Sequence, residues 1–264
     1  MEIKFIHHIS KGSKFNQIYI PKEAESNFEV GDLVEIKLIK KKQNLFYSLN
    51  LEKLSSFKEK LIKELFSFFS KYKEIKQVFI FGSFLTKNIE YHDIDILILT
   101  DRETKNLEKN LNDNLIEEFN LKFHITIGKE DRIKETLKIC PVTRSMLYYY
   151  ASNKKFDLPK ETAINESHLK YLLMMPEDLL KIKLPFGKVY YSSLRKLIVI
   201  ERFLKKNEIA PDEIDSELLK LIKKMELDVL KENLPIEGVL LKDVKSVIRK
   251  KLNIINDLIK NGKK

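Results

Sequence analysis

Two pairs of residues have types and spacing suited to chemistry on phosphates. Gly82 and Ser83 end the apolar run Val78–Phe81, and Asp93 and Asp95 open a second apolar run ten residues after Ser83. A glycine at the end of a buried strand lets the backbone approach a ligand closely, and the serine adds an amide and a hydroxyl, which suits a triphosphate.

Residues at i and i+2 of a strand share one face, so both carboxylates would point the same way and repel each other. A divalent cation removes this repulsion, and the pattern therefore predicts a phosphate and metal site. The alternative is an acidic hairpin that binds nothing.

The surrounding apolar patterns predict the elements that must position these residues. A helix is expected from Ser56, which has capping-box spacing to Glu59. Its apolar face is predicted to carry Phe57, Leu61, Leu65, Phe68 and Tyr72. The following segments are predicted as strands at Gln77–Phe81, Asp93–Leu99 and Leu121–Ile127, and as helices at about Thr104–Phe119, Glu130–Ile139 and Val142–Ser152. This order indicates an α/β unit with a mixed sheet.

The two ends of the chain have different patterns from this centre. Short strands are predicted at residues 2–9, 17–21 and 33–39, separated by turns, and they indicate a small β unit. Beyond Pro159 helical apolar spacing dominates and indicates a helical bundle. The predicted fold class is therefore α+β, with domains at residues 1–48, 52–158 and 159–264.

Composition limits the classes of function. The 264 residues carry a net charge of +10, and residues 151–264 contribute +7 of it, from 24 basic and 17 acidic residues. Such an excess suits a polyanionic partner, although a solvated surface would have the same composition. The lone Cys140 excludes an internal disulfide framework and a multi-cysteine zinc site. With no apolar run of about 18 residues and no signal-peptide pattern at the start, we expect a cytoplasmic protein without a membrane segment.

The buried strand, Gly-Ser pair, ten-residue spacing and Asp-Ile-Asp together resemble the DNA polymerase β-like nucleotidyltransferase superfamily. The resemblance covers about residues 56–158 and is closest to the minimal, archaeal-type members. It implies that Gly82 and Ser83 bind the β and γ phosphates of an NTP, with ATP the expected nucleotide. It also implies that Asp93 and Asp95 bind Mg²⁺ (or Mn²⁺), while an acceptor hydroxyl attacks the α-phosphate with loss of pyrophosphate.

The sequence departs from the family's pattern at the third carboxylate, which members usually carry on a nearby strand. The matching position is His124, between the apolar Phe123 and Ile125. Histidine can bind Mn²⁺ or act as a general base, and we predict a catalytic role for it; the alternative is a polar residue on an exposed sheet face. Glu130 and Asp131 could reach the site only if the chain turns back.

A second resemblance concerns residues 9–39. Lys11-Gly12, the strand Ile18–Lys22, the turn Val30–Asp32 and the strand Leu33–Ile36 look like the AbrB/MazE/SpoVT swapped-hairpin family. That family interleaves two chains, so the resemblance implies a homodimer. It also implies DNA binding through basic residues, for which the candidates are Lys11, Lys14 and Lys22.

These patterns lead to two hypotheses. The first is a metal-dependent nucleotidyltransferase that moves NMP from an NTP to a macromolecular hydroxyl, with RNA favoured over a protein side chain as acceptor. Lys188, Arg195 and Arg202 follow one side of a predicted helix at about 188–206 and would contact RNA phosphates, unless this side is an ordinary solvated face. The second is a dimeric DNA-binding regulator or antitoxin with a catalytically weak nucleotidyltransferase domain, an alternative prompted by His124.

Overall fold

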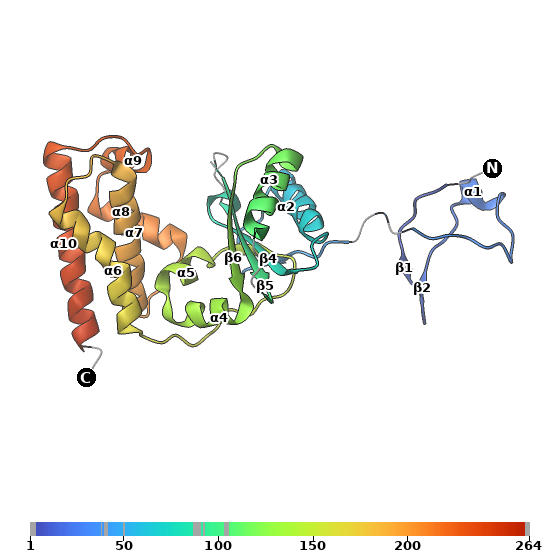
Figure 1. Cartoon of the computed structure of the whole chain (residues 1–264), viewed down its shortest axis with the longest axis horizontal. Helices are drawn as coiled ribbons and strands as arrows, with labels where there is room; N and C mark the ends of the chain where they lie inside the picture. Colours follow the sequence, from blue (N-terminus) through green and yellow to red (C-terminus); the bar gives the residue numbers. More distant parts are fainter. Residues whose placement is uncertain are drawn as a thin grey trace. The chain divides into compact units, whose positions relative to one another are not determined.

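The computed structural model describes residues 4–37, 39, 42–49, 51–86, 91, 93–102 and 106–261. These residues fall into two compact units, Met1–Lys41 and Lys42–Lys264. Figure 1 shows the helices and strands of each unit.

The larger unit contains a five-stranded sheet with the order β3-β7-β4-β5-β6. Its strands are β3 (Phe46–Tyr47), β4 (Ile75–Phe81), β5 (Ile94–Thr100), β6 (Phe123–Lys129) and β7 (Tyr150–Ser152). Strands β5 and β6 are parallel, and the other neighbours are antiparallel. The sheet is mixed, and the prediction of an α+β chain with a mixed sheet is confirmed.

Helices cover both faces of this sheet. Val78 and Ile80 of β4 pack into a core with α2 (Ser56–Phe69) and α3 (Leu107–Phe119). Phe79 and Phe81 pack into a second core on the opposite face, which includes Leu137 of α4 (Glu130–Ile139). Because successive side chains of a strand point to opposite faces, this continuous apolar run is the expected sequence of a strand buried on both sides.

The start of α2 differs in detail from its prediction. The helix begins at Ser56, but Ser55 is the capping residue, and its Oγ accepts a hydrogen bond of 3.3 Å from the amide of Lys58. Phe57, predicted on the apolar face, is 62% exposed, whereas Lys58 is only 8% exposed. The predicted apolar face was therefore wrong in its first turn, where a lysine is buried instead of a phenylalanine.

The predicted helix Val142–Ser152 was wrong in its second half. Helix α5 covers Pro141–Met146, and β7 follows at Tyr150–Ser152. This strand pairs with β4 on one side and β3 on the other, so that its backbone hydrogen bonds are made within the sheet. Tertiary pairing over a long sequence separation decides the conformation here, and a local pattern cannot show it.

The smaller unit differs from the three strands predicted for it. Between residues 4 and 37 its regular elements are β1 (Ser10–Lys11), β2 (Asn16–Gln17) and the short helix α1 (Lys22–Glu25). A strand was predicted at residues 33–39, but Leu33–Lys37 and Ile39 do not form one. Residue 38, and residues 2 and 3 of the strand predicted at 2–9, lie outside the described part. A strand forms only against neighbouring backbone, and a segment of about 40 residues has little of its own to offer.

Within residues 106–261 of the described chain, five helices follow the last strand of the sheet: α6 (Glu166–Lys181), α7 (Gly187–Leu204), α8 (Pro211–Leu221), α9 (Lys224–Lys231) and α10 (Gly238–Asn261). Helix α7 contacts the other four, and its buried residues include Tyr190, Leu194 and Ile198. The boundary predicted between residues 158 and 159 stays a prediction. No helix in the described part of the chain is long and apolar enough to cross a membrane.

Candidate active site

Gly82 forms the turn at the end of β4. Its φ is +79° and its ψ is −159°, a conformation that only glycine adopts readily. A Cβ at this position would lie 2.1 Å from Oδ2 of Asp95, so the missing side chain also makes room for that carboxylate. The exposed Ser83 then begins the short 3-10 helix η1 (Ser83–Leu85). Gly82 therefore places the Gly-Ser turn directly against the second aspartate.

Asp93 comes just before β5, and Asp95 is the second residue of that strand. Asp95 is opposite Phe81 in the pairing of β4 with β5, and the flanking Ile94 and Ile96 are buried on the other face. Burial raises the pKa of Asp95, and the nearby Asp93 raises it further, while a hydrogen bond from His124 lowers it. The net shift is upward, because a half-buried carboxylate beside a like charge is costly to ionise. A positive charge at this point would favour the ionised form.

His124 lies beside Asp95 on the neighbouring strand. The parallel register of β5 and β6 pairs these two residues, and His124 Nδ1 is 3.1 Å from Asp95 Oδ1. Phe123 and Ile125, on either side of His124, are buried in the core with α2 and α3. The structure thus brings together three of the predicted site residues, Gly82, Asp95 and His124, and Asp93 is two residues from this contact.

The other acidic candidates lie at the far end of the same strands. Thr100 pairs with Lys129, five residues along β5 and β6 from the Asp95–His124 pair, which corresponds to about 17 Å of strand. At this end Lys76 Nζ is 2.9 Å from Asp101 Oδ1 and 3.0 Å from Glu130 Oε2. Glu130 is the first residue of α4, and neither it nor the next residue, Asp131, is placed to complete the site.

The donor set of the site fits a cation that is shared with a substrate. Among the residues that the structure describes, no group of three or more His, Cys, Asp or Glu side chains could hold a metal ion by itself. Mg²⁺, however, is commonly bound by one or two carboxylates together with substrate phosphates and water. Asp93 and Asp95 supply two such carboxylates, and Oδ2 of Asp95 lies in the space that a side chain at residue 82 would fill.

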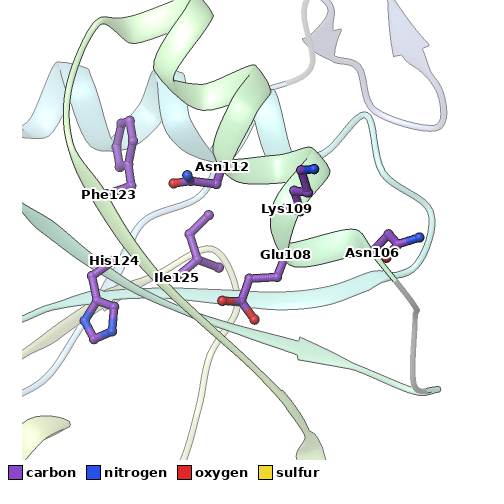
Figure 2. A pocket seen from close by; sticks show the side chains of 7 residues that line it. All are labelled: Asn106, Glu108, Lys109, Asn112, Phe123, His124 and Ile125. Atoms are coloured by element: carbon purple, nitrogen blue, oxygen red, sulfur yellow. The ribbon is translucent and has the colours of Figure 1, made fainter.

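A pocket of about 430 Å³ lies next to His124 at the outer edge of the sheet, between β6 and the start of α3 (Figure 2). Its lining includes His124, Phe123 and Ile125 of β6 together with Asn106, Glu108, Lys109 and Asn112. Asn106, which caps α3, and the three lining residues within α3 were not predicted as site residues. They are ordinary polar positions at the start and on the surface of an amphipathic helix, and no sequence pattern distinguishes them.

The basic residues predicted to bind nucleic acid have different environments. Arg195 is ion-paired with Asp215, and Arg202, whose side chain is 15% exposed, is 3.3 Å from both Glu213 and Glu217. Lys188 at the start of α7 is exposed, as are Lys11, Lys14 and Lys22 in the smaller unit. The two arginines therefore have acidic partners within the chain, and the exposed lysines remain the candidates for contact with phosphates.

Comparison with known proteins gives one family for this part of the chain. Residues 63–140, which include Gly82, Ser83, Asp93, Asp95 and His124, match the family model described as "Polymerase beta, Nucleotidyltransferase". No curated protein matches the chain. The match spans less than a third of the sequence, and it supports the polymerase β-like nucleotidyltransferase superfamily, and nucleotidyl transfer in general, for the segment that holds the site.

Proposed function

We propose that the protein is a metal-dependent nucleotidyltransferase that transfers NMP from an NTP, with ATP the expected nucleotide, to a hydroxyl of a macromolecule. The observation that carries this proposal is the contact between Gly82, Asp95 and His124, with Asp93 two residues away. The family match over residues 63–140 supports the same class of reaction.

The site residues divide the reaction between them. Gly82 and Ser83 would hold the β and γ phosphates, and Asp93 and Asp95 would hold Mg²⁺ or Mn²⁺. When bound, the cation would neutralise phosphate charge and orient the attacking and leaving oxygens. If His124 donates its Nδ1 proton to Asp95 Oδ1, its Nε2 can accept the proton of the acceptor hydroxyl. The hydroxyl oxygen then bonds to the α-phosphorus, and the bond to the β-phosphate breaks to release pyrophosphate.

RNA is the acceptor that the charge distribution favours. Residues 151–264 carry a net charge of +7, and a polyanion would be attracted to them. Lys188 is exposed on α7, whereas Arg195 and Arg202 are ion-paired within the chain. We therefore expect RNA phosphates to be contacted by scattered exposed lysines and not by a row of arginines. A protein hydroxyl is the alternative acceptor.

The proposal is tested by incubating the pure protein with α-labelled NTPs, Mg²⁺ or Mn²⁺, and either total RNA or a cell lysate. We expect label to enter an acceptor, and replacement of both Asp93 and Asp95 by alanine to abolish it. Transfer that is unchanged in the double variant would exclude these carboxylates from the reaction.

A second candidate function, a dimeric DNA-binding regulator or antitoxin, is favoured by the smaller unit. None of its described residues is buried, and large apolar side chains such as Phe15, Val30 and Leu33 are at least 80% exposed. An unburied apolar surface of this kind suits a second copy of the chain, with Lys11, Lys14 and Lys22 available to DNA. Sequence-specific binding that survives moderate salt and is lost on removal of residues 1–48 would support this function.

A further inference from the structure

A buried lysine lies beside the turn that carries Gly82 and Ser83. Lys58, in the first turn of α2, is 8% exposed, and its Nζ donates a hydrogen bond of 2.8 Å to the carbonyl of Thr86. Thr86 is the residue that ends η1, and its own amide and hydroxyl donate to the carbonyl of Ser83 at 3.0 and 2.7 Å. A chain of hydrogen bonds thus connects the amine of Lys58 to Ser83.

Two aromatic rings join this turn to the segment that leads into the aspartates. Phe84 follows Ser83, and Tyr91 lies two residues before Asp93. The rings are in an edge-to-face contact with centroids 5.0 Å apart, and Lys58 Nζ is 5.4 Å from the centroid of Phe84 and 5.7 Å from that of Tyr91. The lysine therefore contacts residues next to both parts of the candidate site: Phe84, which follows Ser83, and Tyr91, which lies two residues before Asp93.

A cation in this position costs free energy that an apolar side chain would not cost. Burial lowers the pKa of Lys58, since the charged form is poorly hydrated there. The carbonyl of Thr86 and the faces of the two rings offset part of that cost, because each presents negative charge to the amine. A leucine or methionine would fill the same apolar face of α2 without these contacts. Packing alone therefore does not account for a lysine at this position, whereas its contacts with Thr86, Phe84 and Tyr91 do.

We propose that Lys58 is a positioning residue for nucleotidyl transfer, which holds the Gly82–Ser83 turn in register with Asp93 and Asp95 through Thr86, Phe84 and Tyr91. This inference rests on the proposed function. It assigns Lys58 no contact with the nucleotide. Its effect is on the geometry between the phosphate-binding turn and the carboxylates, to which transfer rates are sensitive.

The test compares Lys58→Met, Lys58→Arg and the control Lys60→Met, an exposed lysine of the same helix. We expect kcat/KM for NTP to fall about tenfold or more in Lys58→Met, to recover in part in Lys58→Arg, which keeps the charge, and to be unchanged in Lys60→Met. Hydrogen exchange should become faster at Gly82–Thr86 and Asp93–Asp95 in Lys58→Met, and stay unchanged in β6 and α3.

Three results would overturn the inference, and they are distinguishable. If Lys58→Met transfers nucleotide as well as the wild type, Lys58 has no positioning role while the proposed function stands. If exchange accelerates equally throughout the larger unit, the lysine only stabilises the fold. If the wild type neither binds nor transfers an NTP, the proposed function fails and this inference fails with it.

Discussion

At the scale of single residues, the site depends on how closely Gly82 and Asp95 approach each other. The carboxylate occupies the space that a side chain at residue 82 would fill, and its other oxygen faces His124. Gly82 follows β4, Asp95 lies in β5 and His124 lies in β6. A small shift of any of these strands would therefore change the position of the Asp95 carboxylate. The glycine is thus required twice, for its backbone conformation and for the space that it leaves.

We predict that Gly82→Ala reduces transfer at least about tenfold, because the new methyl group collides with Oδ2 of Asp95, and costs about 1–3 kcal/mol in stability, because φ is +79°. Gly238→Ala is the matched control, since its φ of +56° is also positive but no atom lies within 4 Å of the added Cβ. Steady-state transfer rates and chemical denaturation measure both effects. Equal losses of activity in the two variants would show that backbone strain, and not displacement of Asp95, is responsible.

The proximity of Gly82, Asp95 and His124 could largely be predicted from the sequence, for a physical reason. Gly82, Asp95 and the apolar residues around them follow rules of alternation and backbone freedom that act over a few residues. The pairing of Asp95 with His124 also follows once two apolar strands are taken as parallel neighbours in register. Lys58 was missed because helical spacing placed Phe57 on the apolar face, and the burial of a lysine beside Thr86 depends on a loop distant in sequence.

At the scale of elements, the helices after the sheet are joined by a buried network of charges. Lys251 of α10 is 2.7 Å from Glu201 of α7 and 2.6 Å from Glu217 of α8. Burial alone would raise the pKa of Glu201, but hydrogen bonds from Lys205 and Lys251 outweigh it and lower the pKa. For Lys251, burial would lower the pKa, but hydrogen bonds to the two glutamates raise it. The network therefore stabilises the charged forms of its members.

We predict that Lys251→Met destabilises the fold by about 3 kcal/mol at neutral pH, since it leaves a buried carboxylate without one of its partners. The difference in unfolding free energy between variant and wild type should shrink as acid protonates Glu201 near its lowered pKa, and also as the pH rises through the raised pKa of Lys251. Denaturation at several pH values measures this, with the exposed Lys250→Met as control. A difference that does not change with pH would indicate a packing defect and not a lost ion pair.

Elements formed by distant pairing were the least predictable. Strand β7 exists because β3 and β4 flank it, and no local pattern in Tyr150–Ser152 distinguishes it from the end of a helix. Helical apolar spacing was easier to read in α7 and α10, whose buried residues belong to one core.

At the scale of the whole molecule, the smaller unit has too little buried surface to be explained as an isolated chain. Its described residues include none that is buried, and Ile6, Val34, Ile36 and Ile39 are all more than half exposed. A domain of about 40 residues rarely buries enough apolar surface alone, and association of two copies is one way to bury more of it.

We therefore predict a homodimer, in which residues 1–41 supply the contact. Light scattering after size-exclusion chromatography should give the mass of two chains for the full protein and of one chain for a variant that begins at Lys42. A full-length protein that remains a monomer at about 100 μM would contradict this, because apolar interfaces of obligate dimers are occupied well below that concentration.

The most direct test of the account uses NTP labelled at either the α or the γ phosphate, with Mg²⁺ or Mn²⁺ and an RNA acceptor. Nucleotidyl transfer at Asp93 and Asp95 predicts that α label enters the acceptor, that γ label leaves in pyrophosphate, and that Asp93→Ala with Asp95→Ala abolishes both. Entry of γ label into the acceptor, or transfer that persists in the double variant, would contradict it.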